Sequence, residues 1–225
     1  MPPDPVPGQR QAGRMHRTID LKVMYFGTPV VLISTRNPDG SANLAPISSA
    51  WWLNDHCVLG VGDSAQTSAN LHRERECVLN LVPSDMVDAV DQLALTTGKP
   101  EPSPRKAAMG YEFVRDKFAL AGLTEQVSDM VEAPRVAECP VQLECALVHE
   151  TRLGSPGSAA AVFQVRVLRS HVAEELVIPG TQHVDPVGWD PLIMKFCEFF
   201  GGGSLARPSR LAEAWQMPHS GLPTR

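Results

Sequence analysis

The chain has 225 residues, 43% of them hydrophobic and 20% charged, with a formal net charge of −5. This length suits one domain with a sizeable core. The acidic balance without a basic tract argues against nucleic acid as a partner. No apolar run approaches the roughly 18–20 residues of a membrane-spanning helix, and the first residues lack the apolar core of a signal peptide. We therefore expect a cytoplasmic protein.

Five cysteines are present, and most stand in apolar, strand-like runs. Cys139 and Cys145 are six positions apart, which is neither a zinc-ligand spacing nor a distance that a disulfide can bridge along one strand. We predict buried, reduced thiols and no metal site.

Residues 1–18 are rich in proline, glycine and arginine and show no periodicity, which is typical of a flexible arm. A barrel domain is expected over residues 19–178, with a helical and loop excursion over 84–135. Residues 179–225 are expected to form a C-terminal extension that packs on the barrel or on a dimer partner. The two excursions, 99–132 and 179–225, are expected to line or cover the mouth of a site, because such segments often carry specificity.

Six segments have the β-branched or alternating pattern of strands. They are residues 29–36, 41–52, 57–62, 77–82, 139–154 and 159–172. Asp39-Gly40 between the first two is a strong hairpin-turn signal. Two helices are predicted, over 64–76 with Ser64 or Thr67 as N-cap and over 84–98 with Gly98 as terminator. Hairpin-joined strands favour a closed or half-closed antiparallel barrel over a parallel sheet.

The segment "GDSAQTSAN", residues 62–70, is the most informative motif. A strand ends in glycine, and hydroxyl residues then open a helix. The first amides of a helix have no intrahelical partner, so this geometry suits an anion. Ser64, Thr67 and Ser68 add hydroxyl donors, although a simple N-cap would explain one of them. Phosphate binding and plain helix capping both remain open at this point.

Two longer segments carry a resemblance. "PVVLISTRNPDGSANLAPISSAWW" followed by "LGVGDSAQTSANLHRERECVLNLV" resembles the flavin reductase-like, FMN-binding split-barrel family. "FALAGLTEQVS" and "EAPRVAECPVQLEC" resemble later landmarks of that family, so the match covers about residues 24–175. The resemblance implies a mainly β fold with flanking helices, built on an antiparallel six-stranded split β-barrel.

The resemblance also implies a flavin site. Along the flavin ring and ribityl chain it places Asn43, Ala45, Pro46, Ser48 and Ser49. Around the phosphate it places Ser64, Gln66, Thr67 and Asn70, with Thr35 nearby. Many relatives carry a lysine or arginine where this chain has Gln66, and Arg36 or Arg73 could replace that charge. Losing a charge-assisted contact would weaken phosphate binding by roughly 1–2 kcal/mol.

The implied function is hydride transfer from NAD(P)H to FMN, or to FAD as the alternative flavin, by a homodimer. A partner oxygenase or a small molecule would then take the electrons. The flavin carries the chemistry, so no catalytic side chain is assigned. The competing hypotheses are a flavoprotein electron carrier and a flavin-binding dimeric protein without nicotinamide-dependent activity. A split-barrel scaffold that binds no flavin is a third.

"NLAPISSAWW", residues 43–52, is an unusual strand because it contains a proline. Proline cannot donate to a sheet ladder, so Pro46 suggests a strand that faces a cofactor on one side. Alternation places Ser48 and Ser49 on opposite faces, so only one reaches a flavin with its side chain unless the strand bulges. The same rule predicts that one of Trp51 and Trp52 points inward and the other toward solvent or an interface.

Overall fold

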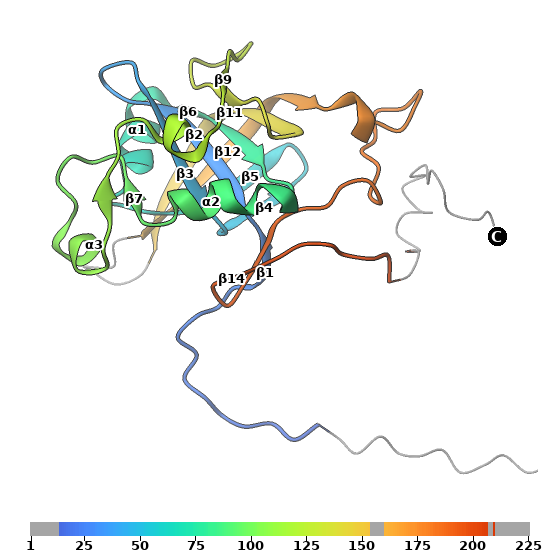
Figure 1. Ribbon diagram of the computed structural model, residues 1–225, viewed down its shortest axis with the longest axis horizontal. Coiled ribbons are helices and arrows are strands. Elements are labelled where there is room, and N and C mark those ends of the chain that lie inside the picture. Colours follow the sequence, from blue (N-terminus) through green and yellow to red (C-terminus); the bar gives the residue numbers. More distant parts are fainter. Residues whose placement is uncertain (1–13, 154–159, 207–208, 210–225) are drawn as a thin grey trace, which may run out of the picture.

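The computed structural model describes residues 14–153, 160–206 and 209. Its centre is one antiparallel sheet that curls into a split barrel (Figure 1). The sheet consists of β2 (Val31–Arg36), β3 (Ala42–Ile47), β4 (Ala50–Leu53), β5 (His56–Gly62), β6 (Glu76–Leu81), β11 (Val141–Leu153) and β12 (Ala160–Val172). Their order is β3-β2-β6-β11-β12-β5-β4. The predicted mainly β class with flanking helices is confirmed.

The central sheet has seven strands where six were predicted, because residues 41–52 do not form one strand. The chain breaks at Ser48 and Ser49, and the two parts go to opposite edges of the sheet. β3 pairs only with β2, while β4 pairs only with β5. Pro46 is tolerated in β3 because an edge strand needs no amide donor on its outer side. The two edges therefore meet at the serine pair.

Gly60 lets the two edges approach closely. Its amide donates to the Ser49 carbonyl over 2.7 Å. A Cβ atom at Gly60 would lie 2.9 Å from the Ser49 Cβ, closer than real Cβ contacts allow. Any larger residue at position 60 would push the Ser48–Ser49 corner away. Gly60 therefore allows that corner to pack closely against β5.

The first helix, α1 (Gln66–Glu74), is shorter than the predicted helix over 64–76. Its N-cap is Ala65, and no side chain caps it, so the predicted capping by Ser64 or Thr67 is wrong. Instead, the Ala65 amide donates to the Gly62 carbonyl over 2.9 Å, and the Ser68 hydroxyl donates to the same oxygen over 2.8 Å. A tight turn after β5 thus leads into the helix, and no side chain caps the amides of its first turn.

The second predicted helix, over 84–98, is also shorter. A 3₁₀ turn, η1 (Ser84–Met86), leads into α2 (Val87–Leu93). Gly98 does not end this helix, because β7 (Thr96–Thr97) begins before it and pairs in parallel with β8 (Glu112–Phe113). Gly98 instead packs closely against the side chains of Asn43 and Gln66.

The remaining elements belong to the excursion and to the C-terminal part. They are α3 (Pro104–Ala108), α4 (Lys117–Ala121), β9 (Glu125–Gln126), β10 (Arg135–Val136) and η2 (Glu174–Leu176). Ser103 accepts a hydrogen bond from the Lys106 amide and so caps α3, and Asp116 caps α4 in the same way through the Ala119 amide. Each short helix therefore has a defined start.

Two apolar clusters hold the domain together. One fills the barrel and includes Val31, Ile33 and Phe163. The other lies between the outer face of the sheet and helices α2 and α4, and it includes Val30 and Leu32. Because successive side chains of a strand point to opposite faces, β2 is buried on both. This double burial explains why its sequence reads as a continuous apolar run.

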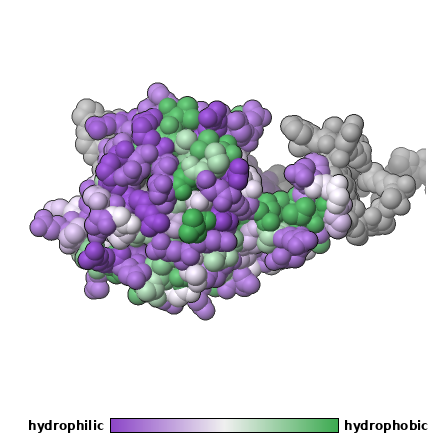
Figure 2. Space-filling view, turned by 90° about the horizontal axis from the view of Figure 1, so that it is seen from above, coloured by the Kyte–Doolittle hydropathy of each residue, from purple (hydrophilic) through white to green (hydrophobic). Residues whose placement is uncertain are grey.

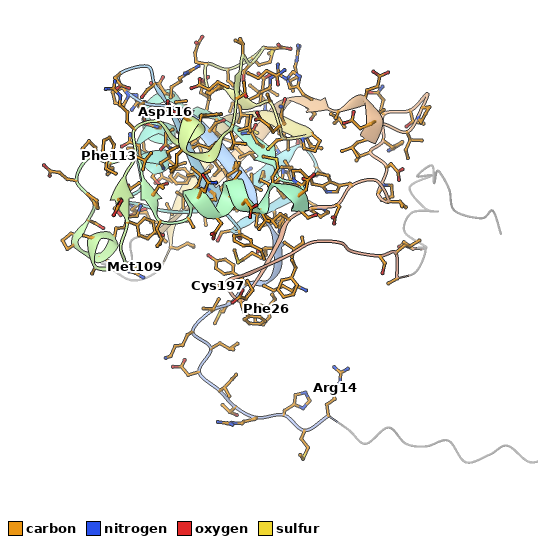
Figure 3. The ribbon with its side chains drawn as sticks, viewed as in Figure 1. Arg14, Phe26, Met109, Phe113, Asp116 and Cys197 are labelled. Carbon is orange, nitrogen blue, oxygen red and sulfur yellow. The ribbon has the colours of Figure 1, made fainter. Side chains whose placement is uncertain are left out.

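A small second sheet joins a strand from the N-terminal part of the chain to two strands from the C-terminal part. β1 (Phe26–Pro29) pairs with β13 (Ile193–Lys195), which pairs with β14 (Glu198–Phe200). Figure 1 shows these strands beside the barrel, with the N-terminal segment continuing away from it, and Figure 3 shows Phe26 and Cys197 in this part. Residues 14–18 are exposed and have no regular structure. The sequence also predicts a turn at 154–158 and a short helix at 209–216, and apart from residue 209 these two segments lie outside the described residues.

The tryptophan and cysteine predictions can be checked directly. Trp52 packs against the barrel cluster, while Trp51 is 55% exposed, so the inward–outward split is confirmed. Cys57, Cys77, Cys139 and Cys145 are buried free thiols, as predicted, and burial raises the pKa of Cys57 to about 12. Cys197 differs, because it is exposed.

One face of the molecule is mostly polar. The face shown in Figure 2 is largely hydrophilic, with separate apolar patches. Among the described residues, no helix has the length and apolar character to cross a bilayer.

Candidate functional site

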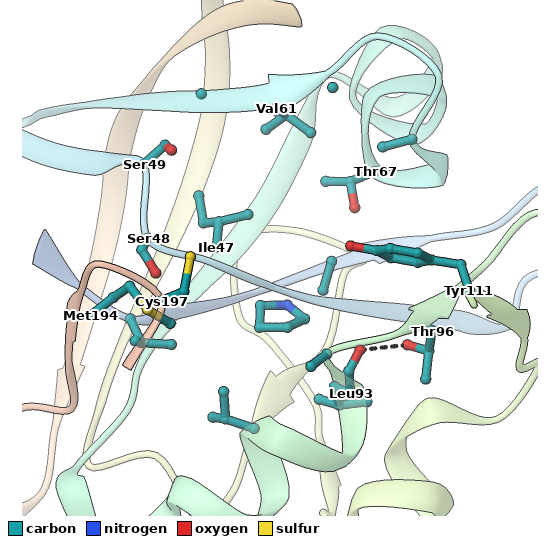
Figure 4. Close-up of a pocket in the computed structure, with 18 of the residues that line it drawn as sticks. Ile47, Ser48, Ser49, Val61, Thr67, Leu93, Thr96, Tyr111, Met194 and Cys197 are labelled. Atoms are coloured by element: carbon teal, nitrogen blue, oxygen red, sulfur yellow. Dashed lines mark hydrogen bonds between the residues drawn. The ribbon is translucent and has the colours of Figure 1, made fainter. Parts of the chain in front are cut away.

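A pocket of about 510 Å³ lies where the two sheet edges meet. This volume falls within the range of small-molecule and cofactor sites. Its walls come from β3, the Ser48–Ser49 corner, β5, the start of α1, helix α2, the excursion and the β13–β14 turn. Figure 4 shows two distinct ends: Ser48, Met194 and Cys197 lie together on one side, and Thr67, Thr96 and Tyr111 on the other.

The first end is formed by β3 and the corner after it. Ala45, Pro46, Ile47, Ser48 and Ser49 all line the pocket. Because β3 is an edge strand, its outward amide and carbonyl groups have no strand partner. The structure therefore presents backbone polar groups and serine hydroxyls beside the apolar side chains of the pocket wall. Such a mixture can orient a planar, heteroatom-rich ring.

The second end is formed by the turn from β5 into α1. Gly62, Ser64, Ala65 and Thr67 line it. With Ala65 as N-cap and no capping side chain, the amides of the first helical turn lack intrahelical acceptors. These amides and the helix dipole favour a negative group. The first turn itself carries no acidic residue that would oppose an anion.

Four of the ten predicted site residues do not line the pocket. Thr35, Asn43, Gln66 and Asn70 lie behind it in one hydrogen-bonded network that joins β2, β3 and α1. Asn43 Nδ2 donates to Thr67 Oγ1 over 3.2 Å, and Asn70 Nδ2 donates to Thr35 Oγ1 over 2.9 Å. Gln66 Nε2 donates to Asn70 Oδ1 over 2.8 Å. The geometry makes them a support for the start of α1.

Gly98 packs against two members of this network, Asn43 and Gln66. A Cβ atom there would overlap Asn43 Oδ1 and would lie 3.0 Å from the Cβ and Cγ atoms of Gln66. Asn43 Oδ1 is buried and has no hydrogen-bond partner among the described residues. The loop that carries Gly98 thus packs directly on the base of the second end of the pocket.

The two arginines considered as substitutes for a charge at position 66 do not line the pocket either. Arg36 Nε donates to the Glu132 carbonyl over 2.7 Å. Arg73 donates to the Arg36 carbonyl and, over 3.2 Å, to Asn70 Oδ1. Both guanidinium groups therefore already have hydrogen-bond acceptors outside the pocket.

Residues 99–132 contribute two pocket residues that no sequence pattern could rank. Lys106 of α3 and Tyr111 both line the pocket, and the Lys106 Nζ atom lies 5.1 Å from the centroid of the Tyr111 ring. The C-terminal part contributes Met194, Cys197 and Phe199. Both excursions thus border the pocket, but neither segment has a periodicity that would have singled out these side chains.

Three lysines of residues 99–132, namely Lys99, Lys106 and Lys117, lie close enough together to affect one another's pKa. Burial, together with the Lys99 ammonium, lowers the pKa of Lys106. Burial and, to a smaller extent, the charge of Lys106 together lower the pKa of Lys117 to about 8. Lys117 Nζ donates to the Leu44 carbonyl of β3 over 2.9 Å. The ammonium groups therefore influence one another electrostatically beside the pocket.

A second cluster of titratable groups lies elsewhere. Asp129, Glu144 and His171 bring their ligand atoms within 4.8 Å of one another. However, Glu144 already accepts from the Asp129 amide over 3.0 Å and from His171 Nε2 over 2.6 Å, and Asp129 pairs with Arg169 over 2.7 Å. These groups satisfy one another, which marks the cluster as a structural link between β11, β12 and the excursion.

Comparison with known proteins defines the class. A model described as "Flavin reductase like domain" matches residues 23–197, which include all ten predicted site residues. The chain belongs to the flavin reductase-like family, as its sequence resemblance implied. The uncharacterized protein YdfE of Bacillus subtilis (strain 168) is 37% identical over 195 residues, which cover 87% of this chain and 93% of the relative.

Solved structures share the fold. Flavoredoxin of Desulfovibrio vulgaris (Miyazaki F) superposes with a TM-score of 0.72 at 19% identity, covering 88% of this chain and 100% of that one. Nitrilotriacetate monooxygenase component B from Bacillus cereus gives 0.66 at 22% identity, covering 81% and 88%. At such identities the likeness concerns the split-barrel architecture alone.

Proposed function

We propose that this protein binds FMN in the pocket and transfers hydride from NAD(P)H to it. The observation that carries the proposal is the pairing of two unlike pocket ends. One offers unpaired α1 amides for a phosphate, and the other offers edge-strand backbone and serine hydroxyls for a ring. A phosphorylated flavin has both parts. FAD remains the alternative flavin, because the same ring and first phosphate would fit it.

Each wall of the pocket would then have a defined task. The amides of the first α1 turn, with Ser64 and Thr67, would hold the phosphate. Ala45 to Ser49 would orient the ring through backbone groups, and Leu93 and Phe199 would exclude water from it. The flavin, when bound, supplies two-electron redox chemistry. The proposal accordingly assigns no catalytic acid or base to this chain.

Thr35, Asn43, Gln66 and Asn70 act indirectly in this proposal. They hold the start of α1 against β2 and β3, so that its amides face the pocket. We keep them as positioning residues, whereas Ala45, Pro46, Ser48, Ser49, Ser64 and Thr67 are the proposed contact residues.

Titration with FMN tests the binding step. We expect saturable quenching of flavin fluorescence by the purified protein, and weaker FMN binding in Ser64→Ala, whose hydroxyl makes no hydrogen bond within the described part of the protein. Ser170→Ala is the matched control, because it removes a hydroxyl on the exposed side of β12 outside the pocket. A chain that binds neither FMN nor FAD would contradict the proposal.

Reduction kinetics separate enzyme from carrier. We expect NADH or NADPH to bleach the absorbance of bound FMN under anaerobic conditions at a rate that supports turnover with free acceptors. A flavoprotein electron carrier, the second candidate, would bind FMN but bleach slowly with both nucleotides. That alternative rests on the same pocket and on the shared fold with a flavoredoxin.

We further propose that the protein acts as a homodimer and that its electrons pass to a small molecule or a partner oxygenase. Exposed apolar side chains on β1, β4 and the β13–β14 turn support the first part, since Phe26, Trp51, Leu53 and Phe196 are each at least half exposed. Sedimentation analysis of the purified chain tests it, and a monomer at micromolar concentration would contradict it.

A further inference from the structure

The first turn of α1, which borders the proposed phosphate end of the pocket, carries no basic residue. The first turn of α1 contains Gln66, Thr67 and Ser68, and the basic residues of α1, His72 and Arg73, stand in its last turn. Arg36 and Arg73 are engaged with backbone carbonyls away from the pocket. A charge-assisted contact to an anion here must therefore come from another element.

Lys106 is the lysine that borders this pocket. It belongs to α3 on the excursion, and it lines the pocket together with Gly62, Ser64 and Thr67. Its partner Tyr111 extends into the pocket on the side of Thr67, as Figure 4 shows, and the Lys106 ammonium lies over the Tyr111 ring. The ring thus holds the ammonium at the α1 end.

No carboxylate neutralises this ammonium. Among the described residues, Lys99, Lys106 and Lys117 form no ion pair, although 20 of the 225 residues are basic and 25 acidic. Instead, the ammonium groups repel one another, because Lys99 acts on Lys106 and Lys106 acts on Lys117. The carboxylate of Asp91 also lines the pocket, but it forms no ion pair with Lys106 within the described part of the protein, so the lysine charges there favour an anionic ligand.

We propose that Lys106 is the cationic contact for the phosphate monoester of the bound flavin, held in place by Tyr111. The inference rests on the proposed function and adds to it a residue from the excursion, far in sequence from α1. The phosphate would lie between the free α1 amides and the ammonium, so the loop carrying α3 would be ordered by the cofactor that it helps to bind.

The test compares FMN with riboflavin, which has the same ring but no phosphate. Lys106→Met keeps the aliphatic stem and removes the charge. We expect its dissociation constant for FMN to rise about tenfold or more, with the constant for riboflavin changed less than twofold. Lys106→Arg is expected to retain most of the FMN affinity. Arg105→Met is the matched control, because it removes one exposed charge from the same helix outside the pocket.

Several outcomes would overturn the inference. Unchanged FMN affinity in Lys106→Met, or an equal loss for FMN and riboflavin, would show that Lys106 does not contact the phosphate. Loss of a preference for NADPH over NADH with unchanged FMN affinity would assign the ammonium to the nucleotide instead. These results leave the proposed function standing, whereas a wild-type chain that binds no flavin removes both proposals.

A second readout protects the test against a misfolded variant. If Lys106→Met is unstable, Lys106→Gln replaces it, and thermal unfolding with and without 1 mM FMN is compared. We also expect wild-type affinity for FMN to fall with added NaCl, because the contact is electrostatic, while affinity for riboflavin stays level. Equal salt dependence of the two flavins would contradict the proposal.

Discussion

Asn70 Nδ2 lies 2.9 Å from Thr35 Oγ1 and, on its other side, 2.9 Å from Asn37 Oδ1. One fully buried amide therefore ties α1 to β2 and to the turn that follows β2. At the same time, the side-chain oxygen of Asn70, Oδ1, accepts a hydrogen bond from Gln66 Nε2. This side chain therefore helps to hold the start of α1, which forms the second end of the pocket, together with the hydrogen bond from Asn43 to Thr67.

Replacing Asn70 with alanine tests that dependence. Because Thr35, Asn37 and Gln66 would each lose a buried partner, we expect the free energy of unfolding to fall by about 3 kcal/mol. Urea unfolding followed by tryptophan fluorescence measures it. Gln92→Ala on the exposed side of α2 should change it by less than about 0.5 kcal/mol. An Asn70→Ala variant as stable as wild type would show that the network is not a support.

Gly98→Ala should damage the same region from outside. The new methyl would overlap the Asn43 amide and press on Gln66, so the loop or the network has to move. Overpacking of this kind costs about 1–3 kcal/mol, and we expect FMN affinity to fall as well. Gly203→Ala is the control, because its Cβ would meet nothing within 4 Å. Equal thermal unfolding temperatures for the two variants would refute the argument.

Lys117 should make stability depend on pH in the alkaline range. Its pKa is about 8 in the folded protein and about 10.5 in the unfolded chain, so the unfolded chain binds more protons between these values. Stability should therefore rise from pH 8 to pH 10.5, by at most about 3 kcal/mol for this group. Because the charge of Lys106 also acts on Lys117, the test compares wild type with Lys117→Met. The stability of Lys117→Met should rise less steeply with pH. Parallel profiles would contradict the assignment.

Glu144 should act in the acidic range, where its contribution to stability also rises with pH. Burial raises its pKa, but the Asp129 and Met130 amides and His171 outweigh burial, so the net pKa is lowered. Its contribution is therefore complete above the unfolded pKa of about 4.3 and is lost as pH falls through the folded value. Glu144→Gln should be less stable than wild type at pH 7 by about 2–3 kcal/mol. The difference should shrink toward pH 3 in urea unfolding, and a constant difference would count against this account.

Sequence alone was sufficient for most of the barrel strands and for the turn that leads from β5 into α1. β2 was predictable because it is buried on both faces, and the β5–α1 turn because glycine and hydroxyl residues mark it. The split of residues 41–52 into β3 and β4 was not, because nothing local shows that neighbouring segments join opposite sheet edges. The network roles of Asn43 and Asn70 were also hidden, since an amide beside a site reads the same whether it contacts a ligand or a helix. The position of Lys106 at the pocket could not be predicted from the sequence either, because it depends on where a proline-rich loop folds back.

The pairing of β1 with β13 also has a consequence for the order of events during synthesis. Met194, Cys197 and Phe199 complete a pocket whose other walls are made much earlier in the chain. A nascent polypeptide that ends before residue 199 contains all the barrel strands but lacks one wall of the pocket. Under the proposed function, tight flavin binding should therefore begin only after synthesis has passed Phe199, although the barrel strands are complete about thirty residues earlier.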